Sequence, residues 1–155
     1  VDRLLAISRG GLIVSRIMSD ILKIPISHMT ISSYQNAKQI KVPEITELPN
    51  TSFEGKSILI VDEVSDTGKT FERAIEHFKS VPVKNVLTAS PYIKPHTKFT
   101  PDFWVENINA WILFPYDIRE TADIFADMFQ TKEKAREKMQ KMGFAQWELD
   151  EVFNS

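Results

Sequence analysis

The sequence predicts an α/β fold in which a parallel sheet is covered by helices on both sides. Short apolar runs alternate with stretches whose apolar residues recur at helical spacing, which is typical of a doubly wound sheet. The run at residues 58–61, Ile-Leu-Ile-Val, has the length and β-branching of a strand that is buried on both faces. Ligands of such sheets bind at the carboxyl ends of the strands, so the residues directly after each run are candidates for function.

The first half of the chain predicts two strands and one helix before a long polar segment. A strand at residues 4–7 precedes a helix at 12–22, and a second strand follows at 26–33. Residues 34–53 are polar, contain prolines and exceed the length of an ordinary connection, which is typical of a lid or a disordered loop. One face of the helix carries large apolar side chains: Leu12, Ile13, Ile17 and Ile21.

The second half continues the alternation and then becomes helical. After the strand at 58–61, Thr70 opens a helix, and further strands are predicted at 83–90 and 111–114, with a loop at 91–101. Beyond Pro115 the apolar spacing predicts three helices, with Thr131 and Gly143 as a cap and a stop between them. These helices are expected at residues 118–129, 132–142 and 145–153.

Length and composition fit a single small domain. The chain has 155 residues, of which 43% are apolar and 26% charged, and its formal net charge is −2. We expect one domain over residues 1–155, with a core at about 4–117 and a C-terminal helical extension at about 118–155.

What the sequence lacks disfavours several kinds of site and partner. It has no cysteine, which excludes a disulfide framework, a thiolate metal site and a cysteine nucleophile. Its basic residues are scattered, and its apolar runs are far shorter than a membrane span. We expect a soluble, cytoplasmic protein that binds neither nucleic acid nor a membrane. Because an apolar run follows Val1-Asp2-Arg3 and there is no initial methionine, we also expect a chain trimmed at its N-terminus.

Residues 58–70 are the most informative stretch. Two adjacent carboxylates, Asp62 and Glu63, follow the strand, and a short polar loop leads into the helix. The backbone N–H groups of residues 66–70 are expected to converge at the helix N-terminus, where unpaired donors and the helix dipole favour a phosphate. The two carboxylates would repel a naked polyphosphate, but they suit sugar hydroxyls or a phosphate-bound divalent metal.

A Walker loop is the first alternative, because Gly68-Lys69-Thr70 matches the end of that motif. The motif also requires a glycine five positions before Gly68, where this chain has Glu63. The stretch instead resembles the thirteen-residue signature of the type I phosphoribosyltransferases: four apolar residues, two acids, two variable positions, then Asp or Ala-Thr-Gly-x-Thr. This resemblance implies a glycosyltransferase with a flavodoxin-like, doubly wound parallel sheet, a mobile hood loop and C-terminal helices.

The resemblance assigns roles to the acid pair and to the loop after it. In the family, the acids hold the ribose hydroxyls of phosphoribosyl pyrophosphate (PRPP), and the loop cradles its 5′-phosphate. Asp62 and Glu63 correspond to the acids, although Glu63 departs from the commoner Asp-Asp. Asp66 corresponds to the residue that contacts purine N7 and acts as general base. The 5′-phosphate loop corresponds to Asp66, Thr67, Gly68, Lys69 and Thr70.

Two further segments correspond to the family's pyrophosphate turn and hood. The resemblance places pyrophosphate at Arg9 and Gly10, after the first strand, and we expect a non-proline cis peptide at the Arg9–Gly10 bond. Ser33 and Tyr34 match the Ser-Tyr of the hood in purine-salvage members. Without the resemblance to this family, Arg9 would be interpreted as an ordinary surface arginine beside the start of a helix.

The acceptor site is implied by Tyr-Ile-Lys94-Pro and by Trp111-Ile112-Leu-Phe-Pro-Tyr-Asp117. Both resemble purine-site motifs of microbial and archaeal xanthine-guanine and hypoxanthine-guanine phosphoribosyltransferases. Lys94 would contact the purine O6, Trp111 would stack on the ring, and the backbone near Ile112 would contact its edge. An ammonium donates only, so it favours a 6-oxo group over the amino group of adenine. Without the family, Lys94 would be a loop lysine and Trp111 a core aromatic.

The sequence therefore predicts a purine-salvage phosphoribosyltransferase that uses Mg²⁺. It would transfer the phosphoribosyl group of PRPP to guanine, xanthine or hypoxanthine, and release a nucleoside 5′-monophosphate and pyrophosphate. Glu63 and Asp117 are the candidate metal ligands, and the family implies a homodimer or tetramer. Two alternatives remain: a transferase for adenine, orotate or uracil, and a PRPP-sensing regulatory protein of the same fold. For the regulator we would expect a basic surface or an additional domain that recognises nucleic acid.

Overall fold

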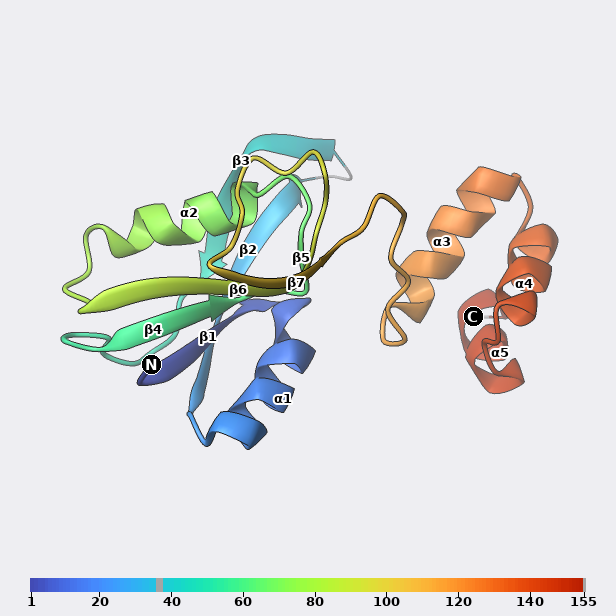
Figure 1. Cartoon of the computed structure of the whole chain (residues 1–155). Helices are drawn as coiled ribbons and strands as arrows, with labels where there is room; N and C mark the ends of the chain where they lie inside the picture. The colour runs from blue at the N-terminus through green and yellow to red at the C-terminus, as the bar shows by residue number, and fades with distance from the viewer. Residues whose placement is uncertain (36–37, 155) are drawn as a thin grey trace. The chain divides into compact units, whose positions relative to one another are not determined.

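The structure, a computed structural model, describes the backbone of residues 1–35 and 38–154, and the side chains of residues 1–32 and 42–154. The chain divides into two compact units, Val1–Asn109 and Ala110–Ser155. The first unit is an α/β sheet structure, and the second is helical (Figure 1).

The first unit is built on a seven-stranded, mostly parallel sheet, which confirms the predicted fold class. The path through the sheet is β3-β2-β1-β4-β6-β5, and β7 pairs with β6. The pair of β2 and β3 is antiparallel, and the other pairs are parallel. The strands are β1 (Arg3–Ser8), β2 (Ile26–Gln35), β3 (Lys38–Glu47), β4 (Ser57–Val61), β5 (Val64–Ser65), β6 (Asn85–Ile93) and β7 (Phe103–Asn107).

Helices α1 (Gly11–Leu22) and α2 (Lys69–Phe78) lie on opposite faces of this sheet (Figure 1). Residues of β1 and β4 alternate between the two faces: Leu5 and Ile60 join the core beside α2, whereas Leu59 joins the core beside α1. Because both faces of the sheet are covered, neither face of a strand needs polar side chains. This explains the uninterrupted apolar run in β4.

Helix α1 forms where the sequence predicts it; Val14 and Met18 pack against the core of the sheet, but the apolar face noted in the sequence is exposed. Its buried residues are Gly11 and Ser15. A side chain at Gly11 would overlap the carbonyl oxygen of Val61, so small residues let this helix approach the sheet closely. Periodicity locates an apolar stripe and does not say what the stripe packs against. The exposed stripe consists of Leu12 (38% exposed), Ile13 (45%), Ile17 (57%) and Ile21 (73%).

Two predictions about strands are wrong. Half of the expected loop at 34–53 is β3, which pairs antiparallel with β2. The expected strand at 111–114 has no regular structure; instead Leu113 packs against the helical core of the second unit. A four-residue apolar run does not distinguish a strand from a buried connection. The outer strand beside β6 is β7, which sequence reasoning missed.

The second unit contains the three predicted helices, α3 (Ile118–Phe129), α4 (Lys132–Lys141) and α5 (Gln146–Phe153). Thr131 caps α4 as predicted, because its hydroxyl accepts a hydrogen bond from the Lys134 N–H at 3.2 Å. Gly143 adopts a φ of 97° between α4 and α5, a conformation that favours glycine. The unit has a core of its own, formed by Ala122, Phe125, Ala135, Met139, Leu149 and Val152.

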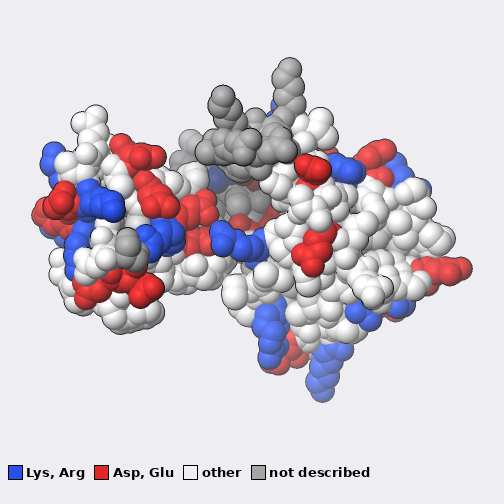
Figure 2. All heavy atoms as spheres, turned by 180° about the vertical axis from the view of Figure 1, so that it is seen from behind, with Lys and Arg blue, Asp and Glu red and all other residues white. Residues whose placement is uncertain are grey.

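Among the residues that the structure describes, no helix is both long enough and apolar enough to span a bilayer. On the face shown in Figure 2, acidic and basic side chains are interspersed on each unit.

Candidate functional site

The acid pair lies directly after β4, at the carboxyl edge of the sheet. Asp62 is buried, with 8% of its surface exposed, and its Oδ1 accepts a hydrogen bond from the Glu63 N–H at 3.0 Å. Burial raises the pKa of the Asp62 carboxyl well above its ordinary value, and the hydrogen bond and negative charge of the Glu63 side chain raise it further. The N–H groups of Glu63 and Gly11 act in the opposite direction. The pair is therefore poised to take up donors or a cation.

The turn after β1 packs against these acids. A side chain at Gly10 would overlap the carboxylate of Glu63 unless that carboxylate moved, so glycine lets the turn and the acid lie in close contact. This contact places the predicted pyrophosphate turn beside the predicted ribose acids. The turn has a non-proline cis peptide, but at Ser8–Arg9 rather than at the predicted Arg9–Gly10 bond. Sequence identifies the turn, whereas the position of the cis bond depends on packing around its backbone. The Arg9 side chain is exposed.

The 66–70 loop leads into α2 as the sequence predicts. The helix begins at Lys69, one residue before the predicted Thr70, and its N-cap is Gly68, with a φ of 85°. Among the described residues, no side chain caps this N-terminus. Its first N–H groups therefore remain available to a ligand, and the positive end of the helix dipole favours an anion there.

Residues 94–99, here named the clamp segment, run beside the 66–70 loop. The Lys94 N–H donates to the Ser65 carbonyl at 3.0 Å, and the Lys98 N–H donates to the Thr67 carbonyl at 3.2 Å. The two segments therefore form a hydrogen-bonded pair that continues the parallel pairing of β5 with β6.

Side chains strengthen the same pairing. The buried Ser65 hydroxyl donates to the Phe99 carbonyl at 2.8 Å and lies 3.0 Å from the Thr97 hydroxyl. The rings of Phe71 and Phe99 stack with their centroids 5.4 Å apart. A side chain at Gly68 would lie 2.7 Å from the Phe99 nitrogen, so the segments approach too closely for any residue but glycine.

Asp66, the predicted general base, is paired with a residue that sequence reasoning missed. Its Oδ1 lies 2.6 Å from His96 Nε2, and both side chains remain more than half exposed. An ionised carboxylate only accepts, so the imidazole N–H is the donor. Sequence placed His96 in a loop; the contact follows from the register that pairs Ser65 with Ile93, which no local pattern reveals.

The candidate purine residues are divided between the two units. Lys94 is half-buried in the first unit. Trp111, Ile112 and Asp117 belong to the second unit. Trp111 is 64% exposed, so it is not a core aromatic. The contacts described above therefore bring together only candidate residues of the first unit.

The hood residues Ser33 and Tyr34 lie at the end of β2, but their side chains are outside the described residues.

The acid pair fits a divalent cation that is shared with a substrate. Glu63 Oε2 is buried and has no hydrogen-bond partner among the described residues, and a buried carboxylate oxygen of this kind calls for a donor or a cation. No group of three or more acidic or histidine side chains in the described part of the chain is suited to hold a metal by itself. Mg²⁺ is commonly bound by one or two carboxylates together with substrate phosphates, which suits this donor set.

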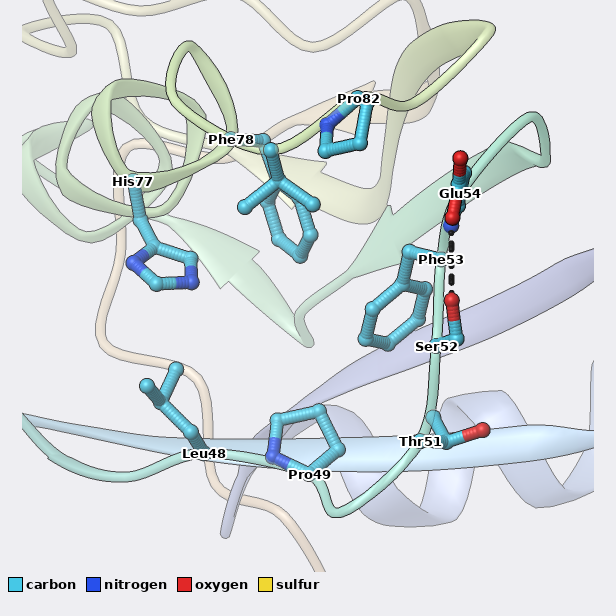
Figure 3. A pocket seen from close by; sticks show the side chains of 10 residues that line it. Leu48, Pro49, Thr51, Ser52, Phe53, Glu54, His77, Phe78 and Pro82 are labelled. Carbon is cyan, nitrogen blue, oxygen red and sulfur yellow. Dashed lines mark hydrogen bonds between the residues drawn. The ribbon is translucent and has the colours of Figure 1, made fainter.

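The opposite edge of the sheet holds a pocket of about 360 Å³ (Figure 3). Phe53 and Phe78 meet there edge to face, with centroids 5.4 Å apart. Burial and the nearby charge of Arg73 lower the pKa of His77. None of the predicted site residues lines this pocket, whose walls are Leu48, Pro49, Thr51, Ser52, Phe53, Glu54, His77, Phe78, Val81 and Pro82.

The fold and the carboxyl-edge site together define an α/β protein suited to a phosphorylated sugar or nucleotide. The family model of the phosphoribosyl transferase domain matches residues 1–121. The chain therefore belongs to the phosphoribosyltransferases, a family of glycosyltransferases, and the predicted family is confirmed.

Relatives of this chain include purine phosphoribosyltransferases. A xanthine-guanine phosphoribosyltransferase from Idiomarina loihiensis is 30% identical over 118 residues, which cover 74% of this chain and 70% of the relative. A hypoxanthine-guanine phosphoribosyltransferase from Schistosoma mansoni is 31% identical over 97 residues, which cover 60% of this chain but only 34% of the relative. The crystal structure of a purine phosphoribosyltransferase from Pyrococcus horikoshii is 37% identical, with a TM-score of 0.65, and the match covers 74% of this chain and 76% of that one.

Proposed function

We propose that the chain is a purine-salvage enzyme that transfers the 5-phosphoribosyl group of PRPP to a 6-oxopurine. The acceptors are guanine, xanthine and hypoxanthine, and the products are the nucleoside 5′-monophosphate and pyrophosphate. The observation that carries the proposal is the contact of Gly10 with the Glu63 carboxylate, which joins the pyrophosphate turn to the ribose acids. The purine relatives support the choice of acceptor.

The proposed reaction is a displacement at C1 of the ribose. A purine ring nitrogen attacks C1 with its lone pair while the C1–O bond breaks and pyrophosphate departs with the bonding electrons. The purine N7 proton passes to Asp66, the general base. Positive charge develops on the ribosyl ring in an oxocarbenium-like transition state. Asp62 and Glu63 hold the ribose hydroxyls close to this charge.

The remaining groups bind the two phosphate ends of PRPP. The backbone N–H groups of the 66–70 loop hold the 5′-phosphate at the start of α2. Arg9 and the backbone at Gly10 hold the pyrophosphate, to which an arginine offers charge-assisted donors. Glu63 and Asp117 would serve as protein ligands of Mg²⁺, which would neutralise charge on the leaving group when bound.

Base recognition falls to Lys94, Trp111 and Ile112. The Lys94 ammonium donates to O6, Trp111 stacks on the purine face, and the backbone near Ile112 contacts the ring edge. Ser33 and Tyr34 belong to a hood that excludes water from the ribosyl centre, where water would otherwise hydrolyse PRPP. The enzyme works in the cytoplasm as a homodimer or tetramer, a state that light scattering of the purified protein tests.

Incubation with PRPP, Mg²⁺ and single bases tests the function. We expect chromatography to detect a nucleoside monophosphate with guanine, hypoxanthine or xanthine, and none with adenine, orotate or uracil. If nucleotide formed only with adenine, orotate or uracil, that base would be the acceptor in place of a 6-oxopurine. Calorimetric binding of PRPP without turnover of any base would instead favour a PRPP-sensing regulator.

A further inference from the structure

His96 stands out because no role in the proposed chemistry has been assigned to it, although it touches the residue that would carry out the proton transfer. Its Nε2 lies 2.6 Å from Asp66 Oδ1. The hydrogen bond uses one carboxylate oxygen, which leaves Oδ2 as the atom that accepts the purine proton. A carboxylate fixed through one oxygen loses rotational freedom before the substrate arrives, and orientation of this kind lowers the barrier of the chemical step.

The backbone holds His96 in a defined place. The Thr97 N–H donates to the Lys94 carbonyl at 3.0 Å, which closes a four-residue turn with His96 at its third position. Pro95, at the second position, has a fixed φ suited to such a turn.

Ser65 anchors both ends of this turn. Its carbonyl accepts from the Lys94 N–H at 3.0 Å, and its hydroxyl lies 3.0 Å from the Thr97 hydroxyl. Because Ser65 directly precedes Asp66, the imidazole and the carboxylate are tied to the same short piece of backbone. The pair therefore differs from a contact between two long side chains that meet on a surface, which contributes little.

We propose that His96 is a positioning residue that orients the Asp66 carboxylate for proton transfer from the acceptor base, an assignment that rests on the proposed function. The same turn carries Lys94, the proposed O6 donor, and so sets the proton acceptor and the base-recognition group from one structural element. The ligand served by this arrangement is a heterocyclic base that has both a ring N–H and an exocyclic oxygen.

Steady-state kinetics of the full chain test the assignment. We expect His96→Ala to lower kcat about tenfold or more, while the KM for PRPP changes less than about twofold, because the positioned group acts in the chemical step. His96→Gln, whose amide N–H is able to replace the imidazole donor, should recover most of the loss. Unchanged kcat in His96→Ala, or equal losses in both variants, would overturn the assignment.

A double-mutant cycle separates action through Asp66 from a general effect on the loop. In an Asp66→Asn background, His96→Ala should cost less than about twofold, because the group that it orients is already lost. Additive losses would show that His96 does not act through Asp66. His28→Ala is the matched control, since His28 also faces an exposed acid, Glu47, at 3.6 Å, and its removal should leave kcat unchanged.

The same experiments distinguish this assignment from the proposed function. Wild-type protein that makes nucleotide, together with an unaffected His96→Ala variant, overturns only the positioning role. Wild-type protein that makes no nucleotide from any base overturns the function, and the assignment with it. Thermal melting of each variant shows whether a loss of activity reflects unfolding.

Discussion

The carboxyl edge of the central sheet and its amino edge differ in how their polar groups are satisfied. At the carboxyl edge, Ser8 Oγ and Glu63 Oε2 are buried without a hydrogen-bond partner among the described residues, and the pKa of the buried Asp62 is raised. At the amino edge, Asp2 and Ser57 exchange two hydrogen bonds of 2.7 Å, one from each backbone N–H. Arg3 Nε is also buried there without a partner among the described residues, but the same guanidinium donates to the Ser27 hydroxyl at 3.0 Å.

The difference indicates where the first unit is stabilised and where it is prepared for a ligand. Buried polar groups without partners destabilise the folded state, by roughly 1–3 kcal/mol each in proteins generally. They are tolerated at the carboxyl edge because a ligand with hydroxyls, phosphates and a cation would satisfy them. The amino edge, with Phe53 and Phe78 in contact, stabilises the sheet and has no buried carboxylate among the described residues.

The largest effect is expected for activity at the carboxyl edge. Asp66→Asn should lower kcat by about 10²–10⁴, the usual contribution of a general base, while PRPP affinity changes little. Single-turnover kinetics and calorimetry measure the two quantities separately. Comparable losses in both would contradict the assigned role. Asp20→Asn is a matched control, because Asp20 is an exposed residue of α1.

The next effect is on stability at the amino edge. Phe78→Ala removes a buried ring, with 3% of its surface exposed, and should lower the free energy of unfolding by about 3–5 kcal/mol. Denaturant titration measures this loss, and the KM for PRPP of the folded fraction should not change. Phe103→Ala, at a residue of β7 that is 56% exposed, should cost less than about 1 kcal/mol. A large rise in the KM for PRPP in Phe78→Ala would show that the two edges are not separable.

A pair of glycine substitutions sharpens the comparison. Gly10→Ala drives a methyl group into the Glu63 carboxylate and should weaken PRPP binding about tenfold or more, because either the Glu63 carboxylate or the pyrophosphate turn must move. Gly55→Ala, in the loop before β4, meets no neighbouring atoms but has a φ of 66°. It should therefore lower stability by about 1 kcal/mol and leave PRPP affinity unchanged. Calorimetry and thermal melting give the two readouts, and the opposite pattern would contradict the division of roles.

The smallest effect concerns the pH dependence of stability. Because the pKa of Asp62 is raised in the folded state, the folded protein holds a proton that the unfolded chain releases as pH rises past the ordinary aspartate value. This contribution to stability is present at low pH and is lost as pH rises through the raised pKa. Asp62→Asn should therefore be more stable than wild type at pH 7, by on the order of 1 kcal/mol, and equal to it below about pH 4. Melting curves at both pH values measure the difference. A variant less stable than wild type at pH 7 would contradict the inference that the ionised Asp62 carboxylate destabilises the folded state.

The sequence predicts much of the fold because long periodic segments and strong local signals determine it. The β4 run, the helix at Lys69–Phe78 and the cap at Thr131 all depend on residues close together in the chain. The strand β3 and the apolar stripe of α1 depend on what lies across the sheet. Local pattern therefore misjudged β3, and it located the stripe without saying whether it is buried.

The candidate site shows the same limit. Asp62, Glu63 and the 66–70 loop are contiguous, so a short signature identifies them. His96 is thirty positions after Asp66 and meets it only because β5 and β6 pair in one register. Even a correct list of secondary structure elements would not have supplied that contact.

The hydrogen-bonded pairing of the clamp segment with the 66–70 loop also has a consequence for protein engineering. Lys94 and Asp66 lie on two neighbouring backbone segments, since the Lys94 N–H donates a hydrogen bond to the carbonyl of Ser65, the residue before Asp66. A graft that exchanges only the segment around Lys94, in order to change the base specificity, would disrupt the hydrogen bonds that the Ser65 and Thr67 carbonyls accept. Transplants should carry both stretches together, as one cassette.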